Sequence, residues 1–263
     1  MRNELKIEDS QIQLFGLGFL AVNLEQAAGI LMDAARGRAK ALVVTPNVDH
    51  IVQLYKNEEF RSIYQTARYV FVDGMPIVWF SHLLPKSFHL PARVNGTNLM
   101  MLICEHASMT DLSVALVGGP EGAAEDATAE LQAKYPSLKV AGYYCPPFGF
   151  ENNQVENQKI VDMVQDWAPD FLFVGVGCPK QERWISENWE TLNFHVAMGI
   201  GSAIELIAGQ TSRAPSWWQN SGLEWLWRLG QEPRRLWKRY LCDDLLFLKI
   251  AWIEYWRIGA SRD

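Results

Sequence analysis

The chain has 263 residues, 49% of them hydrophobic, and a formal net charge of -6. This length allows one large α/β domain with an appendage or two small domains, and the negative charge argues against a nucleic-acid-binding protein. The four cysteines are scattered without a Cys-x-x-Cys pair, so the sequence predicts neither a metal centre nor a disulfide framework, as expected for a reducing compartment. The first ten residues lack an apolar core and no run of 18 apolar residues occurs, so we expect neither a signal peptide nor a membrane-spanning helix.

Short apolar runs alternate with helix-like segments along the chain. The expected strands are 13–19, 41–44, 69–72, 112–117, 138–143, 171–174 and 194–198. The expected helices are 24–38, 48–67, 75–84, 98–108, a segment ending at 134, 151–167 and a segment that starts near 180. Asn23 is expected to cap the first helix, with Gln26 in the capping-box position. This alternation predicts a Rossmann-like α/β fold, a parallel sheet with helices on both faces.

A carboxylate follows the third of these strands. Asp73 comes directly after 69–72, and Pro76 lies in the first turn of the next helix, where a missing N–H is tolerated. Ligands of open α/β sheets bind at the carboxyl ends of strands. Asp73 is therefore a candidate site residue, although it could instead only cap the helix.

The preceding strand ends in the same way. Strand 41–44 is followed by Thr45, Asn47, Asp49 and His50. If the two strands are neighbours, these polar groups and Asp73 converge on one edge of the sheet.

Two glycine-rich turns lead from strands into helices. Gly118 and Gly119 could bring backbone N–H groups to a phosphate, or could simply form a tight turn. In the second turn, 175–182, Lys180 and Gln181 are placed to bind an anion or the edge of a uridine at a helix start. Glu182 is interpreted as an ordinary first-turn acid.

The composition changes near residue 211. Residues 211–263 carry nine Lys/Arg and six Asp/Glu, a charge of +3, whereas the remainder carries -9. They also hold seven of the eleven tryptophans, at positions 217, 218, 225, 227, 237, 252 and 256. We expect a core of residues 1–210 and a helical Trp/Arg-rich appendage of residues 211–263. The appendage could lie at a membrane interface, or its tryptophans could pack on the core.

Several stretches in order resemble the WecG/TagA/CpsF glycosyltransferases. They are TPN (45–47), DGM (73–75), RVNGT (93–97), VGG (117–119), GVGCPKQE (175–182), GIG (199–201), RAP (213–215) and EWLWRL (224–229). The resemblance covers about residues 14–240. PKQE, RAP and EWLWRL are specific, whereas the glycine turns are not.

The resemblance implies an inverting enzyme that needs neither a metal nor another cofactor. The donor would be a UDP-sugar of N-acetylmannosamine, its uronic acid or glucose, and the acceptor a sugar on a polyprenyl diphosphate. Such an enzyme serves bacterial cell-envelope or exopolysaccharide synthesis at the cytoplasmic face of the inner membrane, as a peripheral protein. Homo-oligomerisation is left open.

The resemblance also assigns roles to residues. Asp73 would be the general base, and Thr45 would contact the sugar as a second catalytic residue. The expected substrate-binding residues are Asn47, Arg93, Asn95, Gly118, Gly119, Gly177, Lys180, Gln181, Arg228, Arg234, Arg235 and Arg239. Family members usually carry Asp shortly after the GIG turn, where this chain has Ala203-Ile204-Glu205, so no role is assigned there.

The residue types agree with this chemistry. Inversion at an anomeric carbon needs a base for the acceptor hydroxyl and charge neutralisation for the departing UDP. The chain has no Asp-x-Asp motif, and arginines can replace a metal at phosphate oxygens.

Two other functions remain open from the sequence alone. A nicotinamide-dependent oxidoreductase would fit the alternating sheet, but no turn has G-x-G-x-x-G with an acidic residue about 20 positions on. A non-catalytic membrane scaffold would explain the tail but not the polar groups at the strand ends. NAD fluorescence titration tests the first alternative, and UDP release in an assay would rule out the second.

Overall fold

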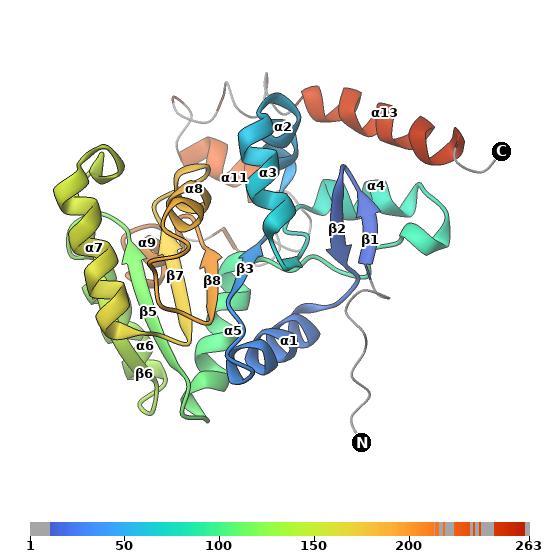
Figure 1. Ribbon diagram of the computed structural model, residues 1–263. Helices are drawn as coiled ribbons and strands as arrows, with labels where there is room; N and C mark the ends of the chain where they lie inside the picture. The colour runs from blue at the N-terminus through green and yellow to red at the C-terminus, as the bar shows by residue number, and fades with distance from the viewer. Residues whose placement is uncertain are drawn as a thin grey trace.

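The computed structural model describes residues 11–212, 214–215, 218, 224–231, 234, 237 and 245–260. At its centre is a sheet of six parallel strands in the order β4-β3-β8-β7-β5-β6 (Figure 1). The strands are β3 (Ala41–Val44), β4 (Tyr69–Val70), β5 (Ser113–Gly118), β6 (Lys139–Tyr144), β7 (Phe171–Gly175) and β8 (Val196–Gly199). The predicted Rossmann-like α/β architecture is confirmed.

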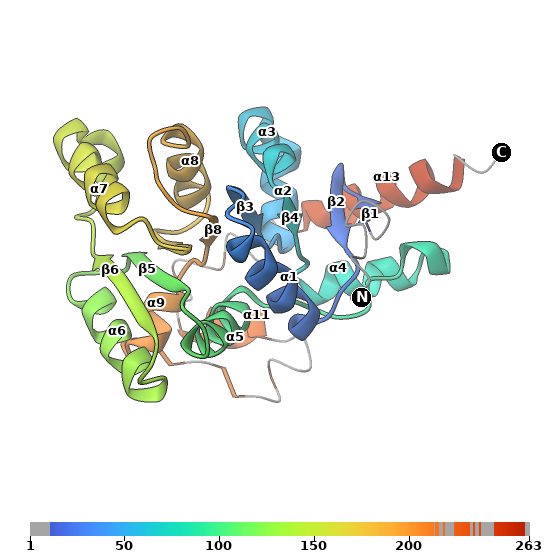
Figure 2. The ribbon, with the colours of Figure 1, turned by 60° about the horizontal axis from the view of Figure 1, so that its bottom comes forward.

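Helices cover both faces of this sheet (Figure 2). Side chains alternate along each strand, so β3 directs Leu42 and Val44 into one apolar core and Ala41 and Val43 into the other. The first core is closed by α2 (Val48–Lys56), α3 (Glu58–Thr66), α7 (Gln154–Trp167) and α8 (Lys180–Glu187). The second core is closed by α1 (Leu24–Arg36), α5 (Gly96–Ser108), α6 (Ala123–Lys134) and α9 (Ala203–Ile207). Because both faces are buried, strands β3, β4, β7 and β8 are apolar throughout, whereas the edge strand β6 begins with the exposed Lys139.

Strands β3 and β4 are neighbours, as the convergence of their polar ends requires. Val44 lies opposite Val70 in the parallel register. The pairing continues beyond the strands, since Asp73 N–H donates to Pro46 O at 3.1 Å. The segment that starts at Thr45, after β3, and the segment that leads to Asp73, after β4, therefore leave the sheet side by side.

The prediction of a single strand over residues 13–19 is wrong. Residues 13–19 are not one strand but parts of a hairpin, β1 (Gln11–Leu14) and β2 (Leu17–Leu20), outside the main sheet. Phe15 and Gly16 form the two-residue turn with φ of 55° and 76°. Two consecutive positive φ values match the right-handed twist of a hairpin, and Gly16 makes this turn accessible.

The helix predicted over 48–67 is also divided. Asn57 has φ of -132° and ends α2, and its side chain accepts a hydrogen bond from Phe60 N–H to cap α3. An asparagine cap inside a helical pattern satisfies a new set of free N–H groups, so one helix becomes two. By contrast, the capping box of Asn23 and Gln26 at the start of α1 is confirmed.

The last helix, α13 (Leu246–Ala260), packs on the core rather than away from it. Phe247, Ile250 and Ile258 belong to the same apolar core as the first face of the sheet. Glu254 is buried; it accepts a hydrogen bond from Phe15 N–H at 2.7 Å and pairs with Arg257 on its own helix. The division into residues 1–210 and 211–263 thus stays a prediction, while α13 itself shares the core.

The remaining elements are α4 (Met75–His82), α11 (Glu224–Gln231), and the short 3-10 helices η2 (Lys86–Phe88) and η3 (Phe150–Asn152). Among the residues described, no helix has the length and apolar character needed to cross a membrane.

Candidate active site

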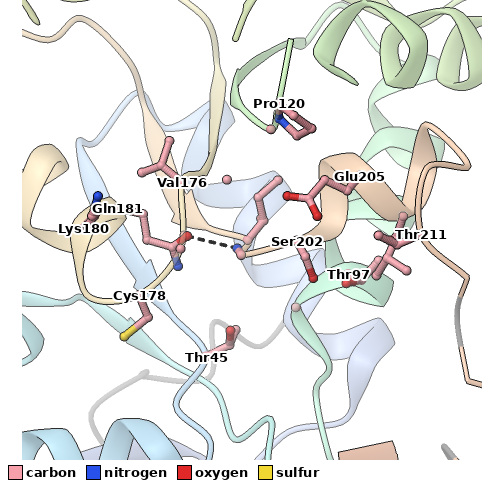
Figure 3. A pocket seen from close by; sticks show the side chains of 18 of the residues that line it. Thr45, Thr97, Pro120, Val176, Cys178, Lys180, Gln181, Ser202, Glu205 and Thr211 are labelled. Atoms are coloured by element: carbon pink, nitrogen blue, oxygen red, sulfur yellow. Dashed lines mark hydrogen bonds between the residues drawn. The ribbon is translucent and has the colours of Figure 1, made fainter. Parts of the chain in front are cut away.

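A pocket of about 750 Å³ opens at the carboxyl edge of the sheet (Figure 3). Residues that follow five different strands line it: Thr45, Asp73, Gly119, Gly177 and Ser202. Its volume lies within the range of about 300–1,000 Å³ that is typical of small-molecule sites. The pocket occupies the place where open α/β sheets bind ligands.

Asp73 is held by the segment that leads into α5. Its Oδ1 accepts hydrogen bonds from Arg93 Nε at 2.9 Å and Asn95 Nδ2 at 3.0 Å, and Oδ2 faces Gly96 N–H at 3.4 Å. Arg93 Nε also reaches the backbone oxygen of Asp73 at 2.8 Å. The N-cap of α4 is Gly74, without a side-chain capping bond, so the alternative that Asp73 merely caps that helix is wrong.

Thr45 lies against the same segment. Its exposed fraction is 8%, and a Cβ placed on Gly96 would lie 3.1 Å from Thr45 Oγ1 and 3.9 Å from Asp73 Oδ2. Gly96 thus lies against both side chains, and a larger residue at position 96 would require Thr45 to shift by a few tenths of an ångström. Asn47 lines the pocket while its side chain caps α2, accepting a hydrogen bond from His50 N–H at 3.3 Å.

On the opposite side of the pocket, Gln181 links the 175–182 turn to the turn of Gly199–Ser202. Its Oε1 accepts a hydrogen bond from Gly201 N–H at 3.0 Å, and only 3% of the residue is exposed (Figure 3). A Cβ on Gly199 would approach Gln181 Nε2 to 2.5 Å, closer than real Cβ atoms come to other atoms. The glycine at 199 thus makes room for the Gln181 amide.

Of the three glycines expected to bind substrate, two line the pocket and one does not. Gly119 and Gly177 line the pocket with φ of 75° and 84°. Gly118 has φ of 140° and is not among the described lining residues; a Cβ there would overlap the backbone of Gly175. Gly118 permits close approach of β5 and β7, which gives it a structural role that its sequence context does not reveal.

Lys180 lies on the pocket wall beside the loop that leads to η3. It pairs with Glu151 and lies over the Phe148 ring at 4.7 Å. The hydrogen bond from Lys180 lowers the pKa of Glu151, so this carboxylate stays charged at neutral pH. The Lys180 ammonium has three N–H donors, so it can donate to an anion in the pocket while it stays paired with Glu151.

The appendage reaches the pocket through α11. Trp227 and Gln231 line the pocket, together with Thr211, Ser212 and Ala214. Of the four arginines predicted from the tail, Arg234 is described and exposed. The side chain of Arg228 and residues 235 and 239 lie outside what the structure describes.

Three potential metal ligands lie close together at the edge of the pocket. One atom each from Asp49, His50 and Cys178 lies within 4.8 Å of the others. Two of these groups already have partners within the protein, since His50 Nδ1 accepts a hydrogen bond from Asn47 N–H at 3.1 Å and Asp49 Oδ2 accepts one from Gln53 Nε2 at 3.1 Å. We therefore assign no metal ion to them.

Comparison with known families decides among the functions that the sequence left open. The family model described as "Glycosyl transferase WecG/TagA/CpsF family" matches residues 12–261. The chain belongs to this family. It is therefore a glycosyltransferase by family, in agreement with the resemblance carried by its motifs.

Curated members of the family from Staphylococcus aureus are named N-acetylglucosaminyldiphosphoundecaprenol N-acetyl-beta-D-mannosaminyltransferase. The protein of strain MW2 is 29% identical over 194 residues, which cover 74% of this chain and 73% of the relative. That of strain MRSA252 is 30% identical over 186 residues, covering 71% and 70%.

The sequence interpretation missed two carboxylates of this WecG/TagA/CpsF member. Glu205, to which no role was assigned, lines the pocket and directs its carboxylate into it from α9 (Figure 3). Glu182, interpreted as an ordinary first-turn acid, is only 3% exposed, and burial raises its pKa to about 7. Its position in the first turn of α8 gave no signal of burial, because first-turn acids usually face water.

Proposed function

We propose that this protein transfers a hexose from a UDP-sugar, with inversion, to a sugar on a polyprenyl diphosphate. Support comes from the arrangement of Asp73 and Thr45 beside Gly96, in a pocket large enough for a nucleotide sugar, in a chain of this family. The names of the staphylococcal relatives specify transfer of an N-acetyl-beta-D-mannosaminyl group to N-acetylglucosaminyl-diphospho-undecaprenol. N-acetylmannosamine is accordingly the first donor sugar to test, before its uronic acid and glucose.

Asp73 is the proposed general base. The acceptor hydroxyl loses its proton to the carboxylate as its oxygen bonds to the anomeric carbon, and the bond from that carbon to the UDP oxygen breaks. Arg93 and Asn95 hold Oδ1, so the orientation of the carboxylate is set before the substrate arrives. Thr45, next to it, contacts the sugar.

The other side of the pocket receives the UDP group. Gly119 and Gly177 have no Cβ, so a diphosphate can come close to their backbone, although the Gly119 N–H already donates to Gly175 O at 3.0 Å; Gln181 lies at the first turn of α8. Asn47 and Lys180 complete this wall. We propose that Arg228, Arg234, Arg235 and Arg239 neutralise the diphosphate, because α11 already brings the appendage to the pocket.

We expect transfer to be independent of divalent cations. Because arginines would take the charge of the leaving UDP, product formation from UDP-N-acetylmannosamine and a synthetic lipid-diphosphate acceptor should continue at full rate in EDTA. The measurement is UDP release with and without chelator. Loss of turnover in EDTA that Mg²⁺ or Mn²⁺ restores would contradict this expectation.

The appendage is also the proposed contact with the membrane, where the protein would act as a peripheral enzyme at the cytoplasmic face. The exposed aromatic side chains of α13, Trp252, Tyr255 and Trp256, are suited to the headgroup region. Basic residues near anionic lipid contribute about 1 kcal/mol each. The lipid-linked acceptor would then reach the pocket beside α11.

Replacing the tail arginines should separate anchoring from catalysis. We expect Arg234→Ala combined with Arg235→Ala and Arg239→Ala to weaken binding to anionic vesicles in a salt-dependent way. The same variant should lose most transfer to a water-soluble acceptor analogue, because the leaving diphosphate loses its cations. Vesicle sedimentation and UDP release are the two measurements.

The control is Lys249→Ala, which removes an exposed cation from α13 without approaching the pocket. Point variants are preferable to truncation after residue 209, since truncation would also strip Phe247 and Ile250 from the core. Full activity of the triple variant on the soluble analogue would show that these arginines contribute to membrane binding and not to catalysis.

A further inference from the structure

The amide of Gln181 is fixed at both ends by groups of the protein. Its Oε1 accepts a hydrogen bond from Gly201 N–H at 3.0 Å, and its Nε2 donates to Glu182 Oε1 at 2.9 Å. Turning the amide over would place its NH2 group against the Gly201 N–H, two donors face to face. The orientation of the Gln181 amide therefore depends in part on the Glu182 carboxylate, which accepts the hydrogen bond from Nε2.

That carboxylate has an unusual environment. Glu182 is 3% exposed and is absent from the described pocket lining, and Tyr64, 1% exposed, donates its O–H to Glu182 Oε1 at 3.5 Å. Within the part of the chain that the structure describes, Glu182 Oε2 is buried without a hydrogen-bond partner, and no ion pair of Glu182 is found. Burial raises the pKa of this carboxyl to about 7, although hydrogen bonds from Gln181, its own backbone N–H, Tyr64 and Cys178 act in the opposite direction.

Such a group is costly to bury and does not stabilise the core. An unpaired carboxylate in an apolar interior loses hydration that a few hydrogen bonds do not replace. A leucine of similar volume would remove this desolvation cost, although Gln181 Nε2 and Tyr64 O–H would lose their acceptor. The contribution of Glu182 must therefore lie in what it orients.

We propose that Glu182 is a positioning residue, which acts through Gln181 to hold the amide and the Gly199–Ser202 turn in the geometry that receives the UDP group. Glu182 does not touch the substrate. The inference rests on the proposed function, since Gln181 is taken to contact UDP. Tyr64 supports Glu182 from α3 through its O–H.

The test compares two replacements of Glu182 by UDP binding, measured by calorimetry on the full-length chain at pH 8. Glu182→Gln keeps an oxygen that can accept from Gln181 Nε2, whereas Glu182→Leu removes the acceptor at similar volume. We expect Glu182→Leu to weaken UDP binding by about 5- to 20-fold, as for loss of one hydrogen bond that couples two groups. Glu182→Gln should bind within about twofold of the parent, and Glu187→Gln, an exposed position on the same helix, should match the parent.

A double-mutant cycle shows whether the effect passes through Gln181. In a Gln181→Met background the Glu182→Leu replacement should have little further effect on UDP binding, because the amide that it orients is gone. Thermal unfolding of each variant is followed in parallel. We expect Glu182→Leu to lower the melting temperature, because Gln181 Nε2 and Tyr64 O–H lose a buried acceptor, whereas Glu182→Gln should keep both the melting temperature and the UDP affinity. A purely structural role would instead give a loss of UDP affinity that is the same in both backgrounds.

Equal UDP affinity of Glu182→Leu and the parent would overturn the inference, as would an equal loss in both backgrounds. If Glu182→Leu fails to fold, Tyr64→Phe, which removes only the O–H, gives the same cycle with a smaller expected loss. Failure of the parent chain to bind UDP would instead count against the proposed function.

Discussion

Asp73→Asn should reduce the turnover number by about 10² to 10⁴-fold with saturating donor and acceptor. The asparagine oxygen can still accept from Arg93 and Asn95, which hold Oδ1 in the parent at 2.9 Å and 3.0 Å. The variant should fold with only a small loss of stability, because its NH2 group replaces the Oδ2 that faces Gly96 N–H, and it should still bind UDP, but it has no basic oxygen for the acceptor proton. The measurement is the steady-state rate of product formation, with UDP affinity determined separately.

Asp111→Asn is the matched control for this variant. Asp111 is a fully exposed carboxylate that pairs with Lys139 at 2.7 Å, far from the chemistry, so its replacement should leave the rate unchanged. If Asp73→Asn kept near-parental turnover at saturating acceptor, Asp73 would not be the general base.

Gly118→Ala should destabilise the fold rather than weaken substrate binding. A Cβ at position 118 would lie 2.8 Å from Gly175 Cα and would overlap the carbonyl of the same residue, and φ at this glycine is 140°. Neither backbone can move without separating β5 from β7, so we expect a loss of about 3 kcal/mol or more in the free energy of unfolding. Urea denaturation measures this loss.

Gly122→Ala separates steric overlap from backbone strain. Gly122 has φ of 82°, but a Cβ there would meet nothing within 4 Å, so only the left-handed conformation is penalised, by about 1 kcal/mol. Equal losses for the two variants would contradict the steric account. A stable Gly118→Ala variant with weakened UDP binding would restore the substrate-binding role predicted from the sequence.

The sheet was predictable because most of its strands, although not the edge strand β6, are short buried runs. Segments such as 171–174 are apolar on both faces, and this pattern appears only when helices cover both sides. The position of Asp73 at a strand end followed from the same pattern. The N-terminal hairpin was not predictable as such, because a continuous run of alternating residues hides a two-residue turn at Phe15 and Gly16.

The partners of the site residues required the structure. Arg93 lies 20 positions from Asp73, so their bond depends on how the chain returns to the sheet after α4, which no local pattern encodes. The burial of Glu182 depends on Tyr64, 118 positions away. The close packing of Gly118 on Gly175 required the structure too, because a glycine needed for strand packing and one needed for a ligand have the same sequence context; its substrate-binding role stays a prediction.

The central claim is that this chain transfers a hexose from UDP to a lipid-diphosphate acceptor with inversion. The most direct test incubates the purified chain in EDTA with a synthetic N-acetylglucosaminyl-diphosphate lipid and, separately, each of the three candidate UDP-sugars. Mass spectrometry of the lipid product detects transfer, and NMR determines the anomeric configuration of the new linkage. We predict that one donor gives a product carrying one added sugar in the β configuration. An α-linked product, or no product with any of the three donors in the presence or absence of Mg²⁺, would contradict the claim.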